Sequence, residues 1–416
     1  MRLLLDVVVH RRSRSLEARP RHFSLVDFGA DTVKAVVVRR EKAGTRVLGY
    51  GLAPAAGRDL SSGRADVAAL AAIADTALTA AEDQTEAAGQ GKVVPDDALF
   101  CIPARLARGE CFTVQQTRSD PTAPIVAREM KVAWERVERL ARERLPLLGD
   151  DSVTWKPLAL TPGAVTVDGH HVTDPVGLKG RELVLSAFGM AVWPSVLRAT
   201  EAAAERLELA LVNVVATPQS LANIVPQREA ILINVGGPGT SLSLIQRDAL
   251  IATHWWPQGG KFFTQSLSQI FDCSPEEAEA LKRAYTDHAL SAEDEKLVAR
   301  SLAGPVDTWC ETLAAALRQM ALAESTRQPA GALLTSDRHE ALPDRIYLTG
   351  GGSLLPDLLR ALHSLESNTS LSFRRSPEIE SLGRRLGSQT PALLDVPSHP
   401  ISDLLAPAMS LATCLE

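Results

Sequence analysis

The chain has 416 residues, of which 45% are hydrophobic and 23% charged, which is typical of a globular protein long enough for two or three domains. Its formal net charge of −6 argues against nucleic acid as the main partner. No apolar run approaches the roughly 20 residues that a membrane-spanning helix needs.

Residues 1–22 are a basic segment whose apolar stretch is short, is broken by Asp6 and precedes the positive charges. A secretory signal has the opposite order. Two interpretations stay open for this segment: a poorly ordered basic tail that could touch a membrane surface, and a start codon placed too early. The five cysteines form no CxxC pair and have no zinc-ligand spacing, which indicates reduced thiols of a cytoplasmic protein.

Residues 24–38 predict an apolar strand, a short turn containing Gly, Asp and Thr, and a second, β-branched strand. Residues 46–54 predict a third strand. Asp66 is then expected to cap an alanine-rich helix that runs to about Ala81. Three strands followed by a helix are the beginning of an α/β domain.

Residues 97–192 predict a separate unit inserted into that domain. Strands are expected near 97–107 and 111–117, a helix over 125–144, and further strands at 152–160, 164–169 and 182–192. The helix has an apolar stripe made of Val126, Met130, Ala133, Val137 and Ala141. The unit therefore has a strand–helix–strand–strand order.

The rest of the chain alternates strands and helices. In order, the sequence predicts a helix at 194–207, a strand at 209–215, two strands within 231–244, a mainly helical region at 261–325, a polar loop at 327–339, a strand, turn and helix at 345–365, and an apolar helix in 399–416.

Three glycine turns recur far apart: "DFGADTVK" (27–34), "NVGGPGTS" (234–241) and "TGGGSLLP" (349–356). Each one alone is most simply a tight connection beside a strand. The first two are hairpin turns whose backbone N–H groups can converge on phosphates. The third opens a helix, whose N-terminus favours an anion or a polar ring edge.

Two common phosphate motifs do not fit these turns. A P-loop needs a GK[ST] sequence, and none of the three turns carries that lysine. A dinucleotide fingerprint needs a third glycine and then a helix, whereas Leu242 and a strand follow Gly237 and Gly239.

The order and spacing of the turns resemble those of the actin-like ATPases, and within them the bacterial cell-division FtsA family. The resemblance covers nearly everything after the basic tail. "IYLTGGGSLLPDLLRAL" (346–362) is similar to the adenosine motif of that family and is the most specific match. "PQGGKFFTQSLSQIFDCSPEEAEALK" (257–282) and "DPVGLKG" (174–180) also resemble FtsA segments. PilM of type IV pili shares this architecture.

The resemblance implies an α/β, actin-like ATPase fold with two lobes around a nucleotide cleft and an inserted strand–helix–strand–strand (SHS2-type) subdomain. The expected boundaries are a tail at 1–22, the first lobe at 23–96 and 193–230, the inserted subdomain at 97–192, the second lobe at 231–385 with a mainly helical insert at about 261–325, and a segment at 386–416 that returns to the first lobe.

The resemblance also implies roles for residues in the three turns and one helix, with ATP and Mg²⁺ as ligands. Asp27 would hold Mg²⁺ through water. The residues that would surround the phosphates are Gly29, Ala30, Asp31 and Thr32, supported by Lys34, and Gly236, Gly237, Gly239 and Thr240. Those beside the ribose and base would be Glu279, Lys282, Gly350, Gly351, Gly352 and Ser353. By spacing alone, Glu279 and Lys282 predict only an ion pair on one helix face.

The second turn departs from the family pattern. Asn234 and Ser241 stand where FtsA-like turns carry Asp, and Pro238 replaces a glycine and removes one N–H. An amide can orient water but brings no negative charge to a metal. Gln219 lies near the usual water-positioning region. We therefore expect ATP binding with very weak or absent hydrolysis.

The FtsA resemblance implies a cytoplasmic scaffold that binds ATP, forms filaments and recruits division proteins such as FtsZ. A PilM-like platform that binds a peptide of an inner-membrane pilus protein is the alternative, and "DPVGLKG" favours FtsA. A third interpretation is an active ATPase or sugar-kinase-type enzyme of the same superfold, which would need a carboxylate base in the second turn.

FtsA proteins typically end in an amphipathic helix that lies on lipid. The last segment here, 402–416, contains no Lys or Arg and is expected to pack in the first lobe. Attachment to the inner face of a membrane would then need a partner or the basic tail.

Overall fold

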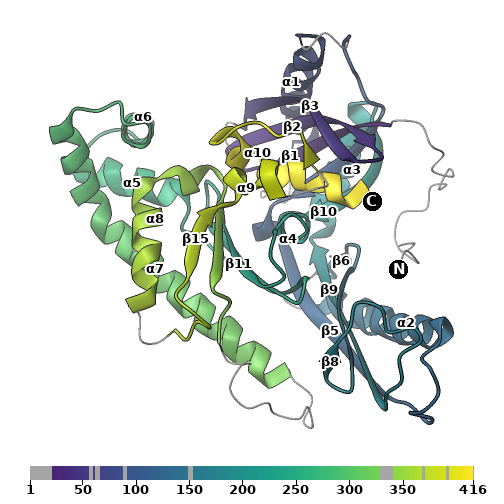
Figure 1. Ribbon diagram of the computed structural model, residues 1–416. Helices are drawn as coiled ribbons and strands as arrows, with labels where there is room; N and C mark the ends of the chain where they lie inside the picture. Colours follow the sequence, from purple (N-terminus) through teal and green to yellow (C-terminus); the bar gives the residue numbers. More distant parts are fainter. Residues whose placement is uncertain are drawn as a thin grey trace.

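The computed structural model describes residues 21–55, 60, 66–87, 91–148, 153–327, 341–367, 371–389 and 393–415. These residues form two mixed β-sheets and one antiparallel β-sheet with helices packed on them, which confirms the predicted α/β class (Figure 1). The predicted basic tail, up to residue 20, and the predicted polar loop after Arg327 lie outside the described residues.

The first sheet has the strand order β10-β4-β1-β2-β3-β16. Its strands are β1 (His22–Phe28), β2 (Thr32–Glu41), β3 (Gly44–Pro54), β4 (Asp97–Ile102), β10 (Ala210–Ala216) and β16 (Leu393–Leu394). Asp66 caps α1 (Val67–Ala87) as predicted, since its Oδ1 accepts the Ala69 N–H at 3.1 Å. Buried side chains of β1, β2 and β4 form the main core with α3 (Pro194–Arg206) and α10 (Ile401–Ser410).

Helix α1 lies directly on the backbone of β3. A Cβ placed on Gly51 would be 2.0 Å from the Ala77 carbonyl oxygen, and one on Gly49 would be 2.2 Å from that of Ala81. Only glycine permits such an approach, because any larger side chain would push the helix off the sheet. These two glycines explain why the third strand contains "LGYGL" in an otherwise β-forming run.

The inserted sheet has the order β5-β9-β7-β8, and β6 also pairs with β9. Its elements are β5 (Ala107–Thr117), α2 (Ala127–Arg144), β6 (Lys156–Pro157), β7 (Thr161–Val167), β8 (His170–His171) and β9 (Glu182–Val192). Met130, Ala133, Val137 and Ala141 of α2 are buried against it, but Val126 precedes the helix and is 48% exposed. Sequence patterns assign β4 to this unit, but β4 pairs with β1 and β10 of the first sheet. An apolar run predicts a strand without indicating which sheet the strand joins.

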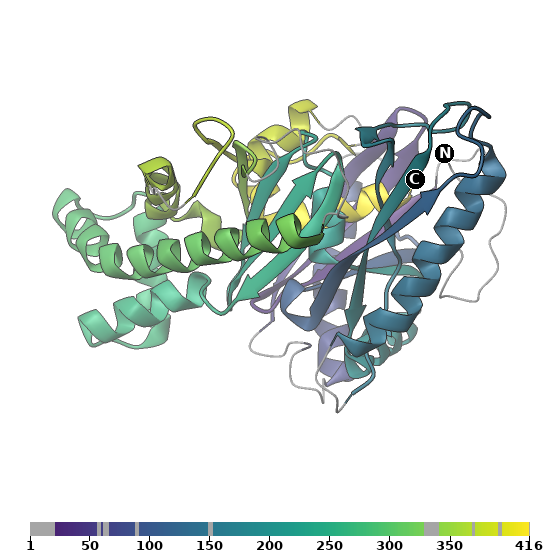
Figure 2. The same ribbon diagram turned by 90° about the horizontal axis from the view of Figure 1, so that it is seen from below.

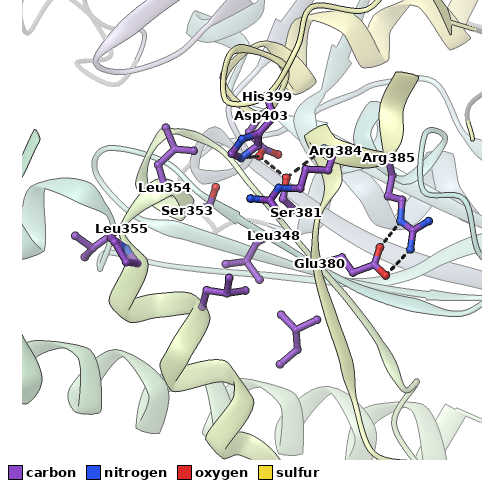
Figure 3. A pocket seen from close by; sticks show the side chains of 13 residues that line it. Leu348, Ser353, Leu354, Leu355, Glu380, Ser381, Arg384, Arg385, His399 and Asp403 are labelled. Carbon is purple, nitrogen blue, oxygen red and sulfur yellow. Dashed lines mark hydrogen bonds and ion pairs between the residues drawn. The ribbon is translucent and has the colours of Figure 1, made fainter. Parts of the chain in front are cut away.

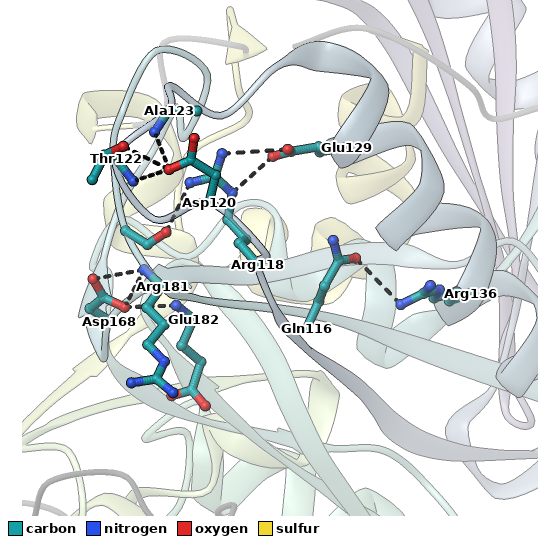
Figure 4. Close-up of polar contacts among 11 residues, drawn as sticks. Gln116, Arg118, Asp120, Thr122, Ala123, Glu129, Arg136, Asp168, Arg181 and Glu182 are labelled. Carbon is teal, nitrogen blue, oxygen red and sulfur yellow. Dashed lines mark hydrogen bonds and ion pairs between the residues drawn. The ribbon is translucent and has the colours of Figure 1, made fainter.

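Polar contacts hold the tip of the inserted unit (Figure 4). The buried Arg118 donates to the carbonyl of Gly180 at 2.8 Å and to the carboxylate of Glu129 at 3.0 Å. The Asp168 carboxylate accepts the backbone N–H groups of Arg181 and Glu182 at 2.9 and 2.7 Å. The "DPVGLKG" segment is therefore bound to the loop before α2 through its backbone.

The second large sheet has the order β13-β12-β11-β14-β15. Its strands are β11 (Ala230–Val235), β12 (Thr240–Gln246), β13 (Ala249–Trp256), β14 (Arg345–Thr349) and β15 (Glu378–Ser381). The helices of this half are α5 (Gly260–Phe271), α6 (Pro275–Thr286), α7 (Ala292–Arg327), α8 (Pro356–His363) and α9 (Leu382–Gln389), and α7 runs along one face of the sheet (Figure 2). β13 and β15 were not predicted.

The C-terminal segment packs into the first core. α10 contacts α4 (Thr217–Ala222), β1 and β2, and Leu405, Met409 and Leu411 are fully buried there. β16 pairs with β3 just before it. Among the described residues, no helix is long and apolar enough to cross a bilayer. The exact domain boundaries stay predictions.

The contact between α1 and β3 gives a first prediction. Gly51→Ala should lower the free energy of unfolding by about 1–3 kcal/mol, because the added methyl group collides with the Ala77 carbonyl. The matched variant Gly304→Ala, in α7, should instead raise it by about 1 kcal/mol, because a Cβ there meets nothing within 4 Å and alanine favours helix. Chemical denaturation measures both. Equal effects of the two variants would contradict the close contact.

Candidate functional site

The three glycine turns lie side by side, although they are up to 320 residues apart in the chain. A Cβ placed on Gly237 of the second turn would be 1.5 Å from Asp31 Oδ2 of the first turn. A Cβ on Gly350 of the third turn would be 2.4 Å from Asn234 Oδ1. The parallel pairing of β11 with β14 sets the last contact, since it places Asn234 opposite Thr349.

In the first turn, Asp27 is the next-to-last residue of β1 and its side chain is only 4% exposed. Lys34 Nζ donates to Asp27 Oδ2 at 2.6 Å and to the Thr32 carbonyl at 3.4 Å. A Cβ on Gly29 would be 2.8 Å from that ammonium group, and Ala30 is buried. The carboxylate expected at a metal is therefore paired with a lysine of the same turn.

Asp31 turns away from its own hairpin toward the second half of the molecule. Its Oδ1 lies 2.5 Å from Nζ of Lys261, the second residue of α5. The Asp31 side chain is 39% exposed and the Lys261 side chain 59%. An ion pair this accessible is worth at most about 1 kcal/mol.

The second turn is fastened to the start of α5 by its backbone. The carbonyls of Gly236 and Gly237 accept the N–H groups of Gly260 and Lys261 at 2.8 and 2.9 Å. Gly236 N–H donates to the Gly239 carbonyl at 3.0 Å. These bonds hold the turn against the helix without any side chain.

The resemblance implies that Thr240 surrounds the phosphates, but its side chain makes contacts within the fold. Its hydroxyl donates to the Gln258 carbonyl at 2.6 Å and accepts the indole N–H of Trp309 at 2.9 Å. Both Thr240 and Trp309 are fully buried. The side chain is thus a structural contact with α7. Ser241, opposite Asn234 in the hairpin, is also buried.

Glu279 and Lys282 form a partly buried cluster of polar contacts between α5 and α6. Lys282 Nζ donates to Glu279 Oε2 at 2.6 Å, to Thr264 Oγ1 at 2.7 Å and to the Gly260 carbonyl at 3.0 Å. Burial raises the pKa of Glu279, but hydrogen bonds from Lys282 and Thr264 outweigh burial and leave that pKa below 4.5. The pair therefore supports the second turn through Gly260.

The third turn depends on a left-handed glycine. Gly350 has φ of 87°, and its N–H donates to the Asp403 carbonyl of α10 at 3.2 Å. The Ser353 hydroxyl donates back to the Gly350 carbonyl at 2.6 Å. Gly352 lies against Val235, since a Cβ there would be 2.5 Å from Val235 Cγ1. Gly351 is exposed.

The water-positioning role expected of Gln219 is wrong. Its side-chain amide donates to the Ala159 carbonyl at 2.9 Å and to Thr161 Oγ1 at 3.1 Å, both in the inserted unit. Gln219 is 3% exposed and joins α4 to that unit. A polar residue in a buried position needs partners, and here they come from a segment about 60 residues away.

A cavity of about 490 Å³ lies beyond the third turn, between α8, β15, α9 and α10 (Figure 3). Leu348, Leu355 and Ile379 contribute apolar walls, and Ser353 lines one edge. At the opposite edge Arg385 is paired with Glu380. No group of three or more metal-ligating side chains was found among the described residues.

Lys261, Trp309 and Asp403 were not predicted as members of this region. The sequence signal for Lys261 was its position directly after "GG", at the start of a helix that follows the second turn. Nothing local in the sequence indicates that Trp309 reaches Thr240, 69 residues away.

The Glu279 cluster predicts a pH-dependent effect. A depressed carboxyl pKa contributes stability that is present above the unfolded value, near 4.5, and is lost as the pH falls through the folded value. Lys282→Met should therefore lower the melting temperature at pH 7, and its difference from the wild type should shrink as the pH falls below 4.5. A difference that stays constant from pH 7 down to about pH 3 would contradict this role.

Comparisons with known proteins find two relatives by sequence and one fold by structure. The chain is 27% identical over 227 residues to the cell division protein FtsA of Enterococcus faecalis, which covers 51% of each protein. It is 23% identical over 353 residues to FtsA of Streptococcus pneumoniae, which covers 82% of this chain and 73% of that protein. The match thus spans about half the length of the first relative. No family model matches the sequence.

Among solved structures, a chain of the PilM–PilN type IV pilus biogenesis complex superposes with a TM-score of 0.60 at 17% identity and covers 94% of this chain and 97% of that one. This likeness extends over both large sheets and the inserted unit. The chain therefore has the actin-like ATPase fold, and it is similar in sequence to FtsA and in structure to PilM.

Proposed function

We propose that the protein is an ATP-binding, actin-like scaffold that acts in bacterial cell division. The observation that carries the proposal is the meeting of three glycine turns from remote segments, where Asp31 lies against Gly237 and Asn234 against Gly350. Polyphosphate sites are built from glycine turns that meet in this way, because their backbone can then approach one ligand. The similarity to two FtsA proteins supports the division role.

The residues fit nucleotide binding better than nucleotide hydrolysis. Gly351 leaves room for a base to approach the backbone, since only the Leu404 side chain lies near it, 3.2 Å from the position of a Cβ. The space beside Gly237 is occupied by Asp31, which a phosphate would have to displace. Asp27 supplies one carboxylate for Mg²⁺, if Lys34 yields it. Asn234 and Ser241 are uncharged, so the second turn supplies no carboxylate to a metal or an attacking water.

The proposed partners are division proteins such as FtsZ and further copies of this chain in a filament. In the FtsA resemblance such contacts fall in the inserted unit, around α2, and in the helical part of the second half, around α6 and α7. We place the protein in the cytoplasm, at the inner face of the membrane through a partner or through its basic N-terminal segment.

Asp27→Asn tests the nucleotide site. We expect the wild type to bind ATP with Mg²⁺, and the variant to bind about tenfold more weakly when Mg²⁺ is present, because it loses one charge-assisted contact. Calorimetric titration with Mg²⁺ and with EDTA measures both affinities. Asp248→Asn is the matched control, because it removes an exposed carboxylate that pairs with Arg228 in the β12–β13 turn.

A wild type that does not bind ATP at millimolar concentration would contradict the proposal and leave a scaffold without a nucleotide. Equal affinities of wild type and Asp27→Asn would remove Asp27 from the metal site. A melting curve of each variant separates weak binding from a loss of folding, since Lys34 loses its partner in Asp27→Asn.

The second turn gives a prediction for turnover. The wild type should hydrolyse ATP far below the roughly 1–1000 per second of ordinary enzymes. The double change Asn234→Asp with Ser241→Asp should raise hydrolysis, because it returns two carboxylates to the positions that FtsA-like turns use. Phosphate release under saturating ATP measures this. Ordinary turnover of the wild type that Asp27→Ala abolishes would favour an active ATPase or kinase instead.

A PilM-like role is the second candidate, because the PilM–PilN structure covers 94% of this chain with a TM-score of 0.60. In that role the protein would bind a short cytoplasmic peptide of an inner-membrane pilus protein. Affinity for such peptides and for FtsZ, both taken from the same genome, can be compared by titration. Binding of the peptide but not of FtsZ would favour the pilus role.

A further inference from the structure

The strongest unexplained contact in the molecule is the one between Asp31 and the second glycine turn. A phosphate-binding turn gathers N–H groups and cations, so a carboxylate at its tip opposes an anionic ligand. Asp31 nevertheless fills the space directly above Gly237, where its Oδ2 is 1.5 Å from the position of a Cβ. It also pairs with Lys261 at 2.5 Å. The carboxylate thus lies against the second turn and is paired with a cation at the start of α5.

We infer that Asp31 is a built-in anion that occupies the polyphosphate position between the first and second turns, and that Lys261 exchanges this carboxylate for a nucleotide phosphate. The inference rests on the proposed ATP site. It assigns Lys261 as a phosphate-binding residue and Asp31 as the group that limits affinity. ATP is then expected to break the Asp31–Lys261 ion pair, after which Lys261 pairs with a phosphate of the nucleotide.

The surroundings allow this exchange. The backbone of the first turn is fixed, because the Ala55 N–H donates to the Asp31 carbonyl at 2.9 Å. The side chain beyond it is 39% exposed and is held by a partner that is 59% exposed, so it can rotate into solvent. The start of α5 is equally fixed, because Lys261 N–H donates to the Gly237 carbonyl. Only the two charged side chains have to move.

The contact also couples the two halves of the molecule. Asp31 belongs to the first sheet through β1 and β2, whereas Gly237 and Lys261 belong to the second half through β11 and α5. Without nucleotide, the ion pair is one exposed contact between these halves. With nucleotide, the phosphates take over the same position, so the ligand replaces an internal contact between the halves.

Opposite effects of the two partners on affinity distinguish this exchange from an ordinary surface ion pair. Asp31→Asn keeps the size of the side chain, removes the competing charge, and should tighten ATP·Mg²⁺ binding about three- to tenfold. Lys261→Gln removes the cation that would receive the phosphate and should weaken binding by a similar factor. Asp248→Asn should change nothing, since it alters an exposed ion pair with Arg228 elsewhere. Calorimetric titration at low salt gives the affinities.

A second readout does not depend on nucleotide. In the nucleotide-free protein, both Asp31→Asn and Lys261→Gln should increase hydrogen exchange of the second turn, residues 236–240, because both break the same contact. The two variants thus agree in this measurement and disagree in affinity. A purely structural ion pair would instead change affinity in the same direction for both.

The outcomes separate the two proposals. If the wild type binds ATP and Asp31→Asn binds equally or more weakly, the exchange is wrong and the ATP site stands. If Asp31→Asn binds ATP and the wild type does not bind it at millimolar concentration, the position of Asp31 in the phosphate space is supported and ATP binding by the wild type is contradicted. If no variant binds ATP at millimolar concentration, the ATP site fails and the exchange fails with it.

Discussion

The placement of the third glycine turn relative to the first sheet depends on Asp403. Its backbone carbonyl accepts the Gly350 N–H and the Thr349 hydroxyl, both at 3.2 Å, while its carboxylate accepts the Gly383 N–H at 2.7 Å and lies 3.3 Å from His399. Burial raises the pKa of this carboxyl, although hydrogen bonds partly oppose that effect. One residue of α10, which packs in the first core, thereby fixes the ends of β14 and the start of α9.

A second point of attachment lies at the Gly236–Gly239 turn, and it also depends on backbone groups. A Cβ on Gly259 would be 2.3 Å from the Gly236 carbonyl, so the turn and the start of α5 touch without side chains between them. The first turn reaches this region through Asp31. Two rigid backbone contacts and one exposed ion pair therefore surround the same volume. A ligand that bound there would change the ion pair, which is the weakest of these three contacts.

Sequence patterns predicted the local parts of this arrangement. The alternation of β1 to β3, the apolar stripe of α2 and the "SPEE" start of α6 depend on neighbours within a few residues, and Ser274 indeed forms a capping box with Glu277. The sheet to which β4 belongs, and the partners of Gln219 and Thr240, depend on residues about 20 to 115 positions away. Local pattern carries no information about such partners. The nucleotide site therefore stays a prediction, and the Gln219 side chain, which we expected to position water, is bound to the inserted unit.

The positions of the carboxylates in the three turns determine whether the proposed site favours binding or hydrolysis of a nucleotide. In FtsA-like turns the expected acidic residues stand at positions 234 and 241, where they face a metal and an attacking water. Here those positions are neutral, and an acidic side chain stands instead at Asp31, against the phosphate space. Negative charge near the metal and the water stabilises a transition state, whereas negative charge near the phosphates opposes the bound ground state. In the proposed ATP site, the chain therefore lacks charge where it would speed hydrolysis and carries charge where it makes binding conditional. That combination suits a protein whose nucleotide changes its shape or its partners more than one whose nucleotide is consumed.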